Sequence, residues 1–135
     1  MTTVELLRPA GLVHSPAFSH VAIIPPGATT ILIGGQNAVD ADGALVGAGD
    51  VAAQVRKVME NLLTALEAAG AGLEHVVHIS LVLAKGVDIN AGYGAALETL
   101  GTLDIPPLVS ALFADLGVPG ALVELSATAA IVRES

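Results

Sequence analysis

The chain has 135 residues, a formal net charge of −8 and no cysteine, and 53% of its residues are hydrophobic. Only five residues are Lys or Arg and only 2% are aromatic. This composition excludes a nucleic-acid-binding protein, because binding of that kind needs clustered cations to neutralise phosphates and aromatic rings to stack on bases. It also excludes disulfides and thiolate chemistry.

The length favours a single domain that spans residues 1–135. The longest stretch without charged residues, 9–39, is interrupted by prolines and glycines, so it does not predict a membrane-spanning helix. The N-terminal residues include Glu5 and lack the cationic start and long apolar core of a signal peptide. We therefore expect a cytoplasmic protein without a membrane partner. The high apolar content favours an oligomer with apolar interfaces.

Three short β-forming segments come first, at residues 4–9, 20–26 and 29–35. The third is rich in β-branched residues and ends in Gly34 and Gly35. Paired glycines at the end of a strand suggest that another group comes close to the backbone there. An Asp-Gly turn signal follows, before the first predicted helix.

Apolar residues at helical spacing predict a long helix that begins after the capping residue Asp50 and ends near Gly70. The remaining elements are a strand, a weaker helix and two strands, at residues 75–84, 89–100, 105–116 and 121–132. The order βββαβαββ predicts an α+β domain in which a six-stranded mixed sheet carries two helices on one face.

Two helices cover only one face of such a sheet. The other face is expected to carry alternate residues of strand 75–84, such as Val76, His78, Ser80 and Val82 or their neighbours. We expect this face to be too apolar to remain in water and to pack against other subunits. Strand ends and loops would then lie at subunit boundaries, where small-molecule clefts are common.

Segments from almost the whole chain, about residues 18–132, resemble the RidA superfamily of reactive-intermediate deaminases, also called YjgF. In chain order they are "GGQNAVDADGALVGAGDVAAQ", "NLLTALEAAGAGLEHVVHISLVL", "INAGYGAAL", "IPPLVSALF" and "LVELSATAA". The resemblance implies a chorismate-mutase-like fold, a homotrimer with ligand clefts between its subunits, and hydrolysis of enamines and imines to ketones and ammonia. We find no cofactor motif and expect no cofactor.

The resemblance implies substrate contacts at the positions that match the deaminase pattern. Gly35 and Gln36 match the substrate loop, and Asn90 with Tyr93 matches the start of the second helix. The N-terminal aromatic residue of the pattern is usually tyrosine and here is Phe18, which lacks the hydroxyl group.

Other positions of the deaminase pattern carry different residues in this chain. The resemblance still implies that these residues line the substrate cleft. The arginine that clamps the substrate carboxylate is replaced by Leu108, and the cysteine two residues later by Ser110. The serine before the Gly-Gln loop is replaced by Gly34, and the glutamate that positions the water by Ser126.

The lost arginine has the largest consequence for the predicted function. Leucine donates no hydrogen bond, and a buried carboxylate without a partner is strongly disfavoured. Removing one partner of a buried charged pair costs about 2–5 kcal/mol. We therefore expect a more apolar site that does not favour imines derived from amino acids.

Two residues are candidates for acid–base chemistry. Glu124 lies on an apolar strand and is either a structural hydrogen-bond acceptor or a retained acid–base group, whereas His20 is a candidate proton carrier. Ser110 has no base that the sequence identifies, so we interpret it as a lining residue. His75 and His78 fall on opposite faces of one strand and cannot share a metal ion, so we predict no metal site and interpret each as a buried or interface histidine.

Three functions follow from these observations. The first is a homotrimer that binds a small, relatively apolar molecule between its subunits, without the standard 2-imino-acid deaminase activity. The second is an enamine or imine hydrolase, or a tautomerase, that acts on a neutral hydrophobic substrate. The third is a protective, chaperone-like protein that acts through exposed apolar surface.

Overall fold

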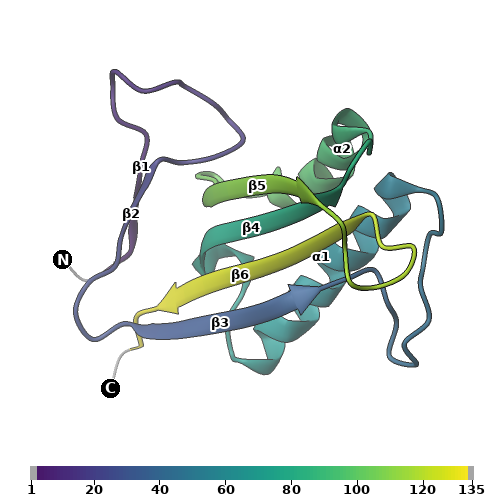
Figure 1. Cartoon of the computed structure of the whole chain (residues 1–135). Helices are drawn as coiled ribbons and strands as arrows, with labels where there is room; N and C mark the ends of the chain where they lie inside the picture. Colours follow the sequence, from purple (N-terminus) through teal and green to yellow (C-terminus); the bar gives the residue numbers. More distant parts are fainter. Residues whose placement is uncertain (1–2, 134–135) are drawn as a thin grey trace.

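The computed structural model of the chain describes residues 3–133, and it confirms the α+β class with two helices and six strands (Figure 1). A short 3-10 helix, η1, precedes the fourth strand. The elements are β1 (Glu5–Leu7), β2 (Val21–Ile23), β3 (Thr29–Gln36), α1 (Val51–Ala68), η1 (Leu73–His75), β4 (Val76–Ala84), α2 (Ile89–Leu100), β5 (Leu108–Ala114) and β6 (Val123–Ile131).

The six strands form two sheets, which corrects the prediction of one six-stranded sheet. Four strands are arranged in the order β3-β6-β4-β5, whereas β1 and β2 pair only with each other. The β4–β5 pair is parallel and the other pairs are antiparallel, so the larger sheet is mixed as predicted. Pro25 and Pro26 lie between β2 and β3. They supply no N–H group for strand pairing, which agrees with the end of β2 before them.

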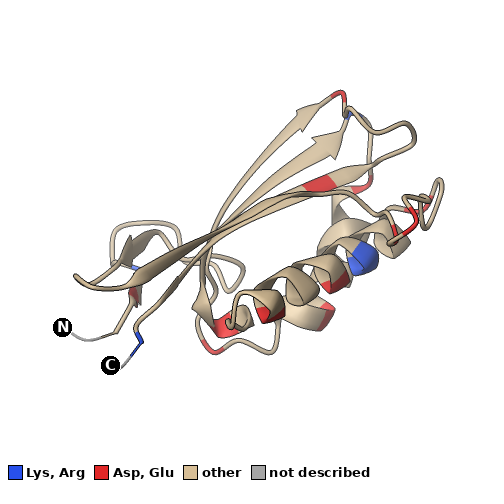
Figure 2. Ribbon diagram, turned by 90° about the horizontal axis from the view of Figure 1, so that it is seen from below, with Lys and Arg blue, Asp and Glu red and all other residues tan. Residues whose placement is uncertain are grey.

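Both helices lie on the same side of the four-stranded sheet (Figure 2). Helix α1 packs against β3, β6 and α2. The side chain of Asp50 caps α1 by accepting a hydrogen bond from the N–H of Ala53, and Gly70 follows the helix with φ +73°. Both ends of α1 therefore agree with the sequence prediction.

Gln54 is a buried polar residue on α1 that joins the helix to two loops. Its side-chain nitrogen donates to the carbonyl oxygens of Gly47 and Gly120, and its Oε1 accepts from the N–H of Leu122 at 2.8 Å. These bonds hold the chain before α1 and the chain before β6 in place, which fixes where β6 enters the sheet.

The side of the four-stranded sheet away from the helices is called the open face below. Along β6, Val123 and Leu125 are buried beneath the helices, whereas the alternate residues Glu124 and Ser126 point to the open face. The other side chains on this face that concern the site are Leu32, His78, Ser80, Val82, Leu108, Ser110, Leu112 and Thr128.

The open face is less apolar than the sequence suggested. Val76 belongs to the core, because the pairing of β4 with β6 is irregular between Val76 and His78. Leu32 and Leu112 are exposed by 77% and 55%, but they border a band of histidine, serine, threonine and glutamate side chains. Between residues 3 and 133, no helix has the combination of length and hydropathy that crossing a membrane requires.

Candidate functional site

The paired glycines lie where β3 leaves its regular register. The pairing of β3 with β6 shifts between Ile33 and Gln36, so Gly34 and Gly35 form an irregular strand end. A Cβ atom on Gly35 would lie 2.9 Å from Cδ of Glu124, whereas one on Gly34 would meet nothing within 4 Å. Of the two glycines, only Gly35 has a close neighbour on the side where a Cβ atom would lie. That neighbour is the carboxyl group of Glu124, the candidate acid–base residue.

Glu124 is placed on the open face by its register in β6, opposite Val82 of β4. Its side chain is partly buried. In the part of the chain that the structure describes, no hydrogen bond or ion pair engages its carboxylate. The structure therefore gives no support, within one protomer, to a role as acceptor for backbone groups.

A row of three serines crosses the open face. Ser80 on β4 is the direct partner of Ser110 on β5 and of Ser126 on β6. Neighbouring strands are about 4.8 Å apart, so the row places three hydroxyl groups within roughly 10 Å. Glu124 lies two residues before Ser126 on β6 and points to the same face. Gly34, Gly35, Ser110, Glu124 and Ser126 thus share this side of the sheet, with the glycines on the edge strand β3 and Ser110 on the opposite edge strand β5.

Ser110 also has a basic partner that sequence reasoning missed. The Nε2 atom of His78 lies 2.9 Å from Oγ of Ser110, within hydrogen-bonding distance. The two residues are on different strands, and only the parallel register of β4 and β5 brings them together. A hydroxyl group beside an imidazole can donate or receive a proton, which is the geometry of a nucleophile–base or relay pair. The alternation of polar residues on both strands is the signal that could have suggested this pair.

Leu108 begins β5 on the open face, as the direct partner of His78. The five Lys and Arg residues lie elsewhere (Figure 2). They are Arg56 and Lys57 on α1, Arg8 after β1, Lys85 in the turn after β4, and Arg133 after β6. Arg56 and Lys57 make ion pairs with Glu98 and Glu60. The open face of a protomer thus offers hydroxyl, imidazole and carboxyl groups around a leucine.

Phe18 and His20 belong to the loop between β1 and β2, away from the open face. Their rings meet edge to face with centroids 5.3 Å apart, and Nε2 of His20 lies 2.7 Å from the carbonyl oxygen of Val13. Buried Ser19 ties this loop to the entrance of β5 by donating from Oγ to the carbonyl oxygen of Pro106 at 2.6 Å. Within one protomer, His20 thus contacts its own loop.

Of the two remaining candidates, Asn90 lies apart from the sheet and Gln36 lies at the end of an edge strand. Asn90 is exposed in the first turn of α2, where its N–H donates to the capping carboxylate of Asp88 at 3.0 Å. Gln36 ends β3, and its side chain donates to the carbonyl oxygen of Gly34 at 3.2 Å. In one protomer the predicted residues therefore fall into two groups, with Phe18, His20 and Asn90 outside the open face.

His75 has a structural role. Its Nδ1 accepts a hydrogen bond from the N–H of Gly72 at 2.9 Å at the start of η1. The sequence predicts His75 and His78 on one strand, but His75 ends η1 and β4 begins at Val76. Among residues 3–133 no group of three His, Asp or Glu side chains is arranged to hold a metal ion.

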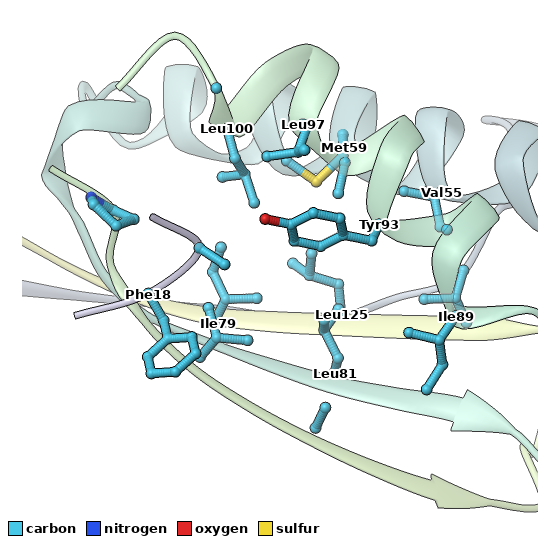
Figure 3. Close-up of a pocket in the computed structure, with 18 of the residues that line it drawn as sticks. Phe18, Val55, Met59, Ile79, Leu81, Ile89, Tyr93, Leu97, Leu100 and Leu125 are labelled. Atoms are coloured by element: carbon cyan, nitrogen blue, oxygen red, sulfur yellow. The ribbon is translucent and has the colours of Figure 1, made fainter. Parts of the chain in front are cut away.

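A cavity of about 620 Å³ lies on the other side of the sheet, between α2 and the strands. Tyr93 and Leu97 of α2, Met59 of α1 and Ile79 of β4 contribute to its walls (Figure 3). Phe18 lies at one end. This cavity is distinct from the open face, because it uses the alternate residues of the same strands.

A mixed four-stranded sheet with two helices on one face defines an α+β protein. The sequence profile of the Endoribonuclease L-PSP family matches residues 12–131. The chain therefore belongs to this family, also known as the YjgF/RidA family, and the resemblance stated from the sequence is confirmed.

Solved structures agree with this assignment. The Rid-family protein YyfB of unknown function from Yersinia pestis is 28% identical, with a TM-score of 0.83 over 97% of this chain and 100% of that chain. A putative endoribonuclease L-PSP from Entamoeba histolytica is 26% identical, with a TM-score of 0.68 over 96% and 100% of the two chains. RidA from Psychrobacter shares the fold at 24% identity, with a TM-score of 0.68 over 93% and 94%. The comparison with curated proteins gave no match.

Proposed function

We propose that the protein is a cytoplasmic homotrimer that binds a small, neutral and relatively apolar molecule in clefts between its subunits, without standard 2-imino-acid deaminase activity. The observation that carries the proposal is Leu108. It occupies the position where the deaminase pattern has its carboxylate-binding arginine, and it lies on the same face as Gly34, Ser110 and Ser126.

The electrostatics of this face favour a neutral ligand. A carboxylate that leaves water must regain hydrogen bonds from charged or backbone donors. Glu124 is the charged group nearest to the glycine pair, and it repels an anion. Hydroxyl groups of Ser80, Ser110 and Ser126 can instead bind a carbonyl, imine or hydroxyl group of an uncharged ligand.

The division of the candidates into two groups supports a cleft that is completed by a second subunit. In one protomer Phe18 and Asn90 lie away from the serine row. A neighbouring copy packed against the open face would cover exposed Leu32 and Leu112, and it would bring its own loop residues to the cleft. Burial of such exposed leucines is a common driving force for association.

The pair of His78 and Ser110 favours a second candidate function. The 2.9 Å contact allows a proton to pass between imidazole, hydroxyl and a bound substrate. Hydrolysis of a neutral enamine or imine, or tautomerisation of an enol, needs such proton transfers but no carboxylate clamp. In this function Glu124 and the His78–Ser110 pair would act as acid–base groups.

Turnover of freshly generated 2-iminobutyrate, measured as ammonia release, tests the absence of deaminase activity. We expect no turnover above the uncatalysed rate for the wild-type protein. The Leu108→Arg variant, assayed in parallel, is expected to gain binding of 2-imino acids. Rapid turnover by the wild type would contradict the interpretation that Leu108, in place of an arginine, prevents 2-imino-acid deaminase activity. Turnover of a neutral enamine alone would favour the second candidate.

A further inference from the structure

The cavity between α2 and the sheet arises from the small residues of α2. Gly92 and Ala96 line the cavity and Ala95 is buried in the core, and none of the three has a side chain long enough to reach the strands. On the sheet, Ala111 of β5 is similarly short and faces the same space. Short side chains thus contribute to the cavity from both sides, and longer ones such as Tyr93 and Leu97 of α2 and Ile79 of β4 complete its walls.

Helix α2 is held by α1 and does not pack onto the sheet. Arg56 on α1 makes three hydrogen bonds to the carboxylate of Glu98 on α2, with lengths of 2.9 to 3.1 Å. Gly92 lies at the contact between the two helices, where a Cβ atom would be at an ordinary van der Waals distance, 3.6 Å, from side chains of Val51 and Val55. These contacts keep α2 beside α1 and leave the space above β4 and β5 unfilled.

The walls of this cavity are almost entirely apolar, and its volume of about 620 Å³ is within the range of roughly 300–1,000 Å³ that is typical of small-molecule sites. Tyr93 is the polar exception in its middle. Figure 3 shows the ring of Tyr93 between α2 and the strands, with the hydroxyl group directed along the cavity. No hydrogen bond joins this hydroxyl group to another residue in the described range 3–133, so it is available to a ligand.

Three charged residues also line the cavity, and their charges do not favour an anionic ligand. Arg8 and Asp104 both contribute to the lining, and their charges are opposite. Asp88 also lines the cavity, but its carboxylate accepts from the N–H groups of Asn90 and Ala91 as the cap of α2. One positive and two negative residues give this lining no excess of positive charge for an anion, and the otherwise apolar wall favours an uncharged ligand.

We propose that this cavity is a second binding site, for an uncharged, predominantly apolar molecule that carries one hydroxyl or carbonyl group. The apolar part of the ligand fills the space between α2 and the sheet, and its polar group binds the hydroxyl group of Tyr93. An unfilled apolar space leaves its lining atoms without partners on one side, so occupation by such a molecule recovers dispersion contacts that the protein alone lacks. The site does not depend on the function proposed for the open face, because it lies on the opposite side of the sheet.

Fluorescence titration with N-phenyl-1-naphthylamine, a neutral apolar probe with one N–H group, tests the proposal. We expect saturable binding with one probe per chain and an increase in the melting temperature. Ala111→Phe fills the cavity from the sheet and Ala96→Phe fills it from α2, so each is expected to weaken binding at least roughly tenfold, a change of about 1.4 kcal/mol. Circular dichroism establishes that each variant is folded.

Leu112→Phe is the matched control, because Leu112 is the next residue of β5 and points to the open face. We expect this variant to bind the probe as the wild type does. Absence of probe binding to the wild type, as would follow from collapse of α2 onto the sheet, would overturn the proposal. So would unchanged binding to both cavity-filling variants, or loss of binding only in Leu112→Phe, which would place the probe on the open face. None of these results bears on the ammonia-release assay.

Discussion

The carboxyl group of Glu124 lies directly over the backbone of Gly35, so close that a single methyl group on Gly35 would lie 2.9 Å from Cδ and 3.0 Å from Oε1. Gly34 has no such neighbour. The two glycines at the end of β3 therefore have different surroundings. Gly35 makes room for a candidate acid–base group, and Gly34 leaves the adjoining part of the open face uncovered.

Substitution of the two glycines by alanine is expected to have different effects on stability. Gly34→Ala should leave the free energy of unfolding within about 0.5 kcal/mol of the wild-type value or raise it, because its backbone requires no positive φ. Gly35→Ala should be less stable than Gly34→Ala by no more than about 1 kcal/mol, because the carboxyl group of Glu124 must move but is the free end of a flexible side chain. Urea denaturation measures both differences.

A double mutant tests the cause of the Gly35→Ala effect. In a Glu124→Ala background the methyl group of Gly35→Ala meets no carboxyl group, so the two glycine substitutions should become equivalent. A difference that persists in this background would show that another neighbour, and not Glu124, restricts position 35.

The pair of His78 and Ser110 makes a prediction for the second candidate function. If the pair carries protons, Ser110→Ala and His78→Gln should each lower kcat for a neutral enamine by roughly 100-fold, and the double variant should lose no more than either single variant. Ser80→Ala is the control for loss of a ligand-binding hydroxyl group alone, with an effect on KM more than on kcat, because Ser80 is adjacent in the serine row but makes no contact with His78 through its hydroxyl group in the described residues. Additive effects of the two single substitutions would contradict a shared role.

Gln54→Leu is expected to destabilise the protein by about 2–4 kcal/mol, because it removes the partners of two carbonyl groups and of the N–H of Leu122 in a buried position. Thr64→Ala on the exposed side of α1 is the control and should change stability by less than about 0.5 kcal/mol. Thermal unfolding followed by circular dichroism compares the two. A value for Gln54→Leu as small as that of the control would show that the loops are held by other contacts.

The ion pair between the helices predicts a small dependence of stability on pH. Hydrogen bonding to Arg56, more than charge attraction, lowers the pKa of Glu98 below its ordinary value. The folded state therefore favours the ionised carboxylate. Its contribution is complete above the ordinary glutamate pKa and is lost as the pH falls through the lower pKa of the folded state. Since both groups are exposed, the effect is small and is screened by salt.

Comparison of the wild type with Glu98→Gln at low ionic strength isolates this contribution. We expect the wild type to be slightly more stable at neutral pH, and the two proteins to converge in acid after Glu98 is protonated. The same comparison at high salt should reduce the neutral-pH difference. A difference that grows as the pH falls would have the wrong sign for a lowered pKa.

Much of the fold could be predicted from local sequence patterns. Asp50 and Gly70 marked the ends of α1 because capping and left-handed backbone are local properties. The predicted apolar strand that carries Glu124 likewise contains all of β6. The separation of β1 and β2 from the larger sheet was not predicted, because strand pairing depends on where the chain turns after Pro25 and Pro26.

The site could be predicted only in part. The family resemblance identified Leu108 and Ser110, but the contact of Ser110 with His78 depends on the register of two strands that are separated by α2. The cavity was missed for a similar reason. The cavity is bounded by residues that are far apart in the sequence, such as Ala96 of α2 and Ala111 of β5, and its shape depends on how α1 holds α2.

Sedimentation velocity of the wild-type protein at micromolar concentration tests the central claim, that a second copy covers the open face and completes the cleft. Three chains of 13.4 kDa give an expected species of about 40 kDa. Ser80→Arg places a charge in the middle of the open face and is expected to shift this species toward the single chain. A wild-type protein that sediments as a stable species of 13.4 kDa would contradict the account.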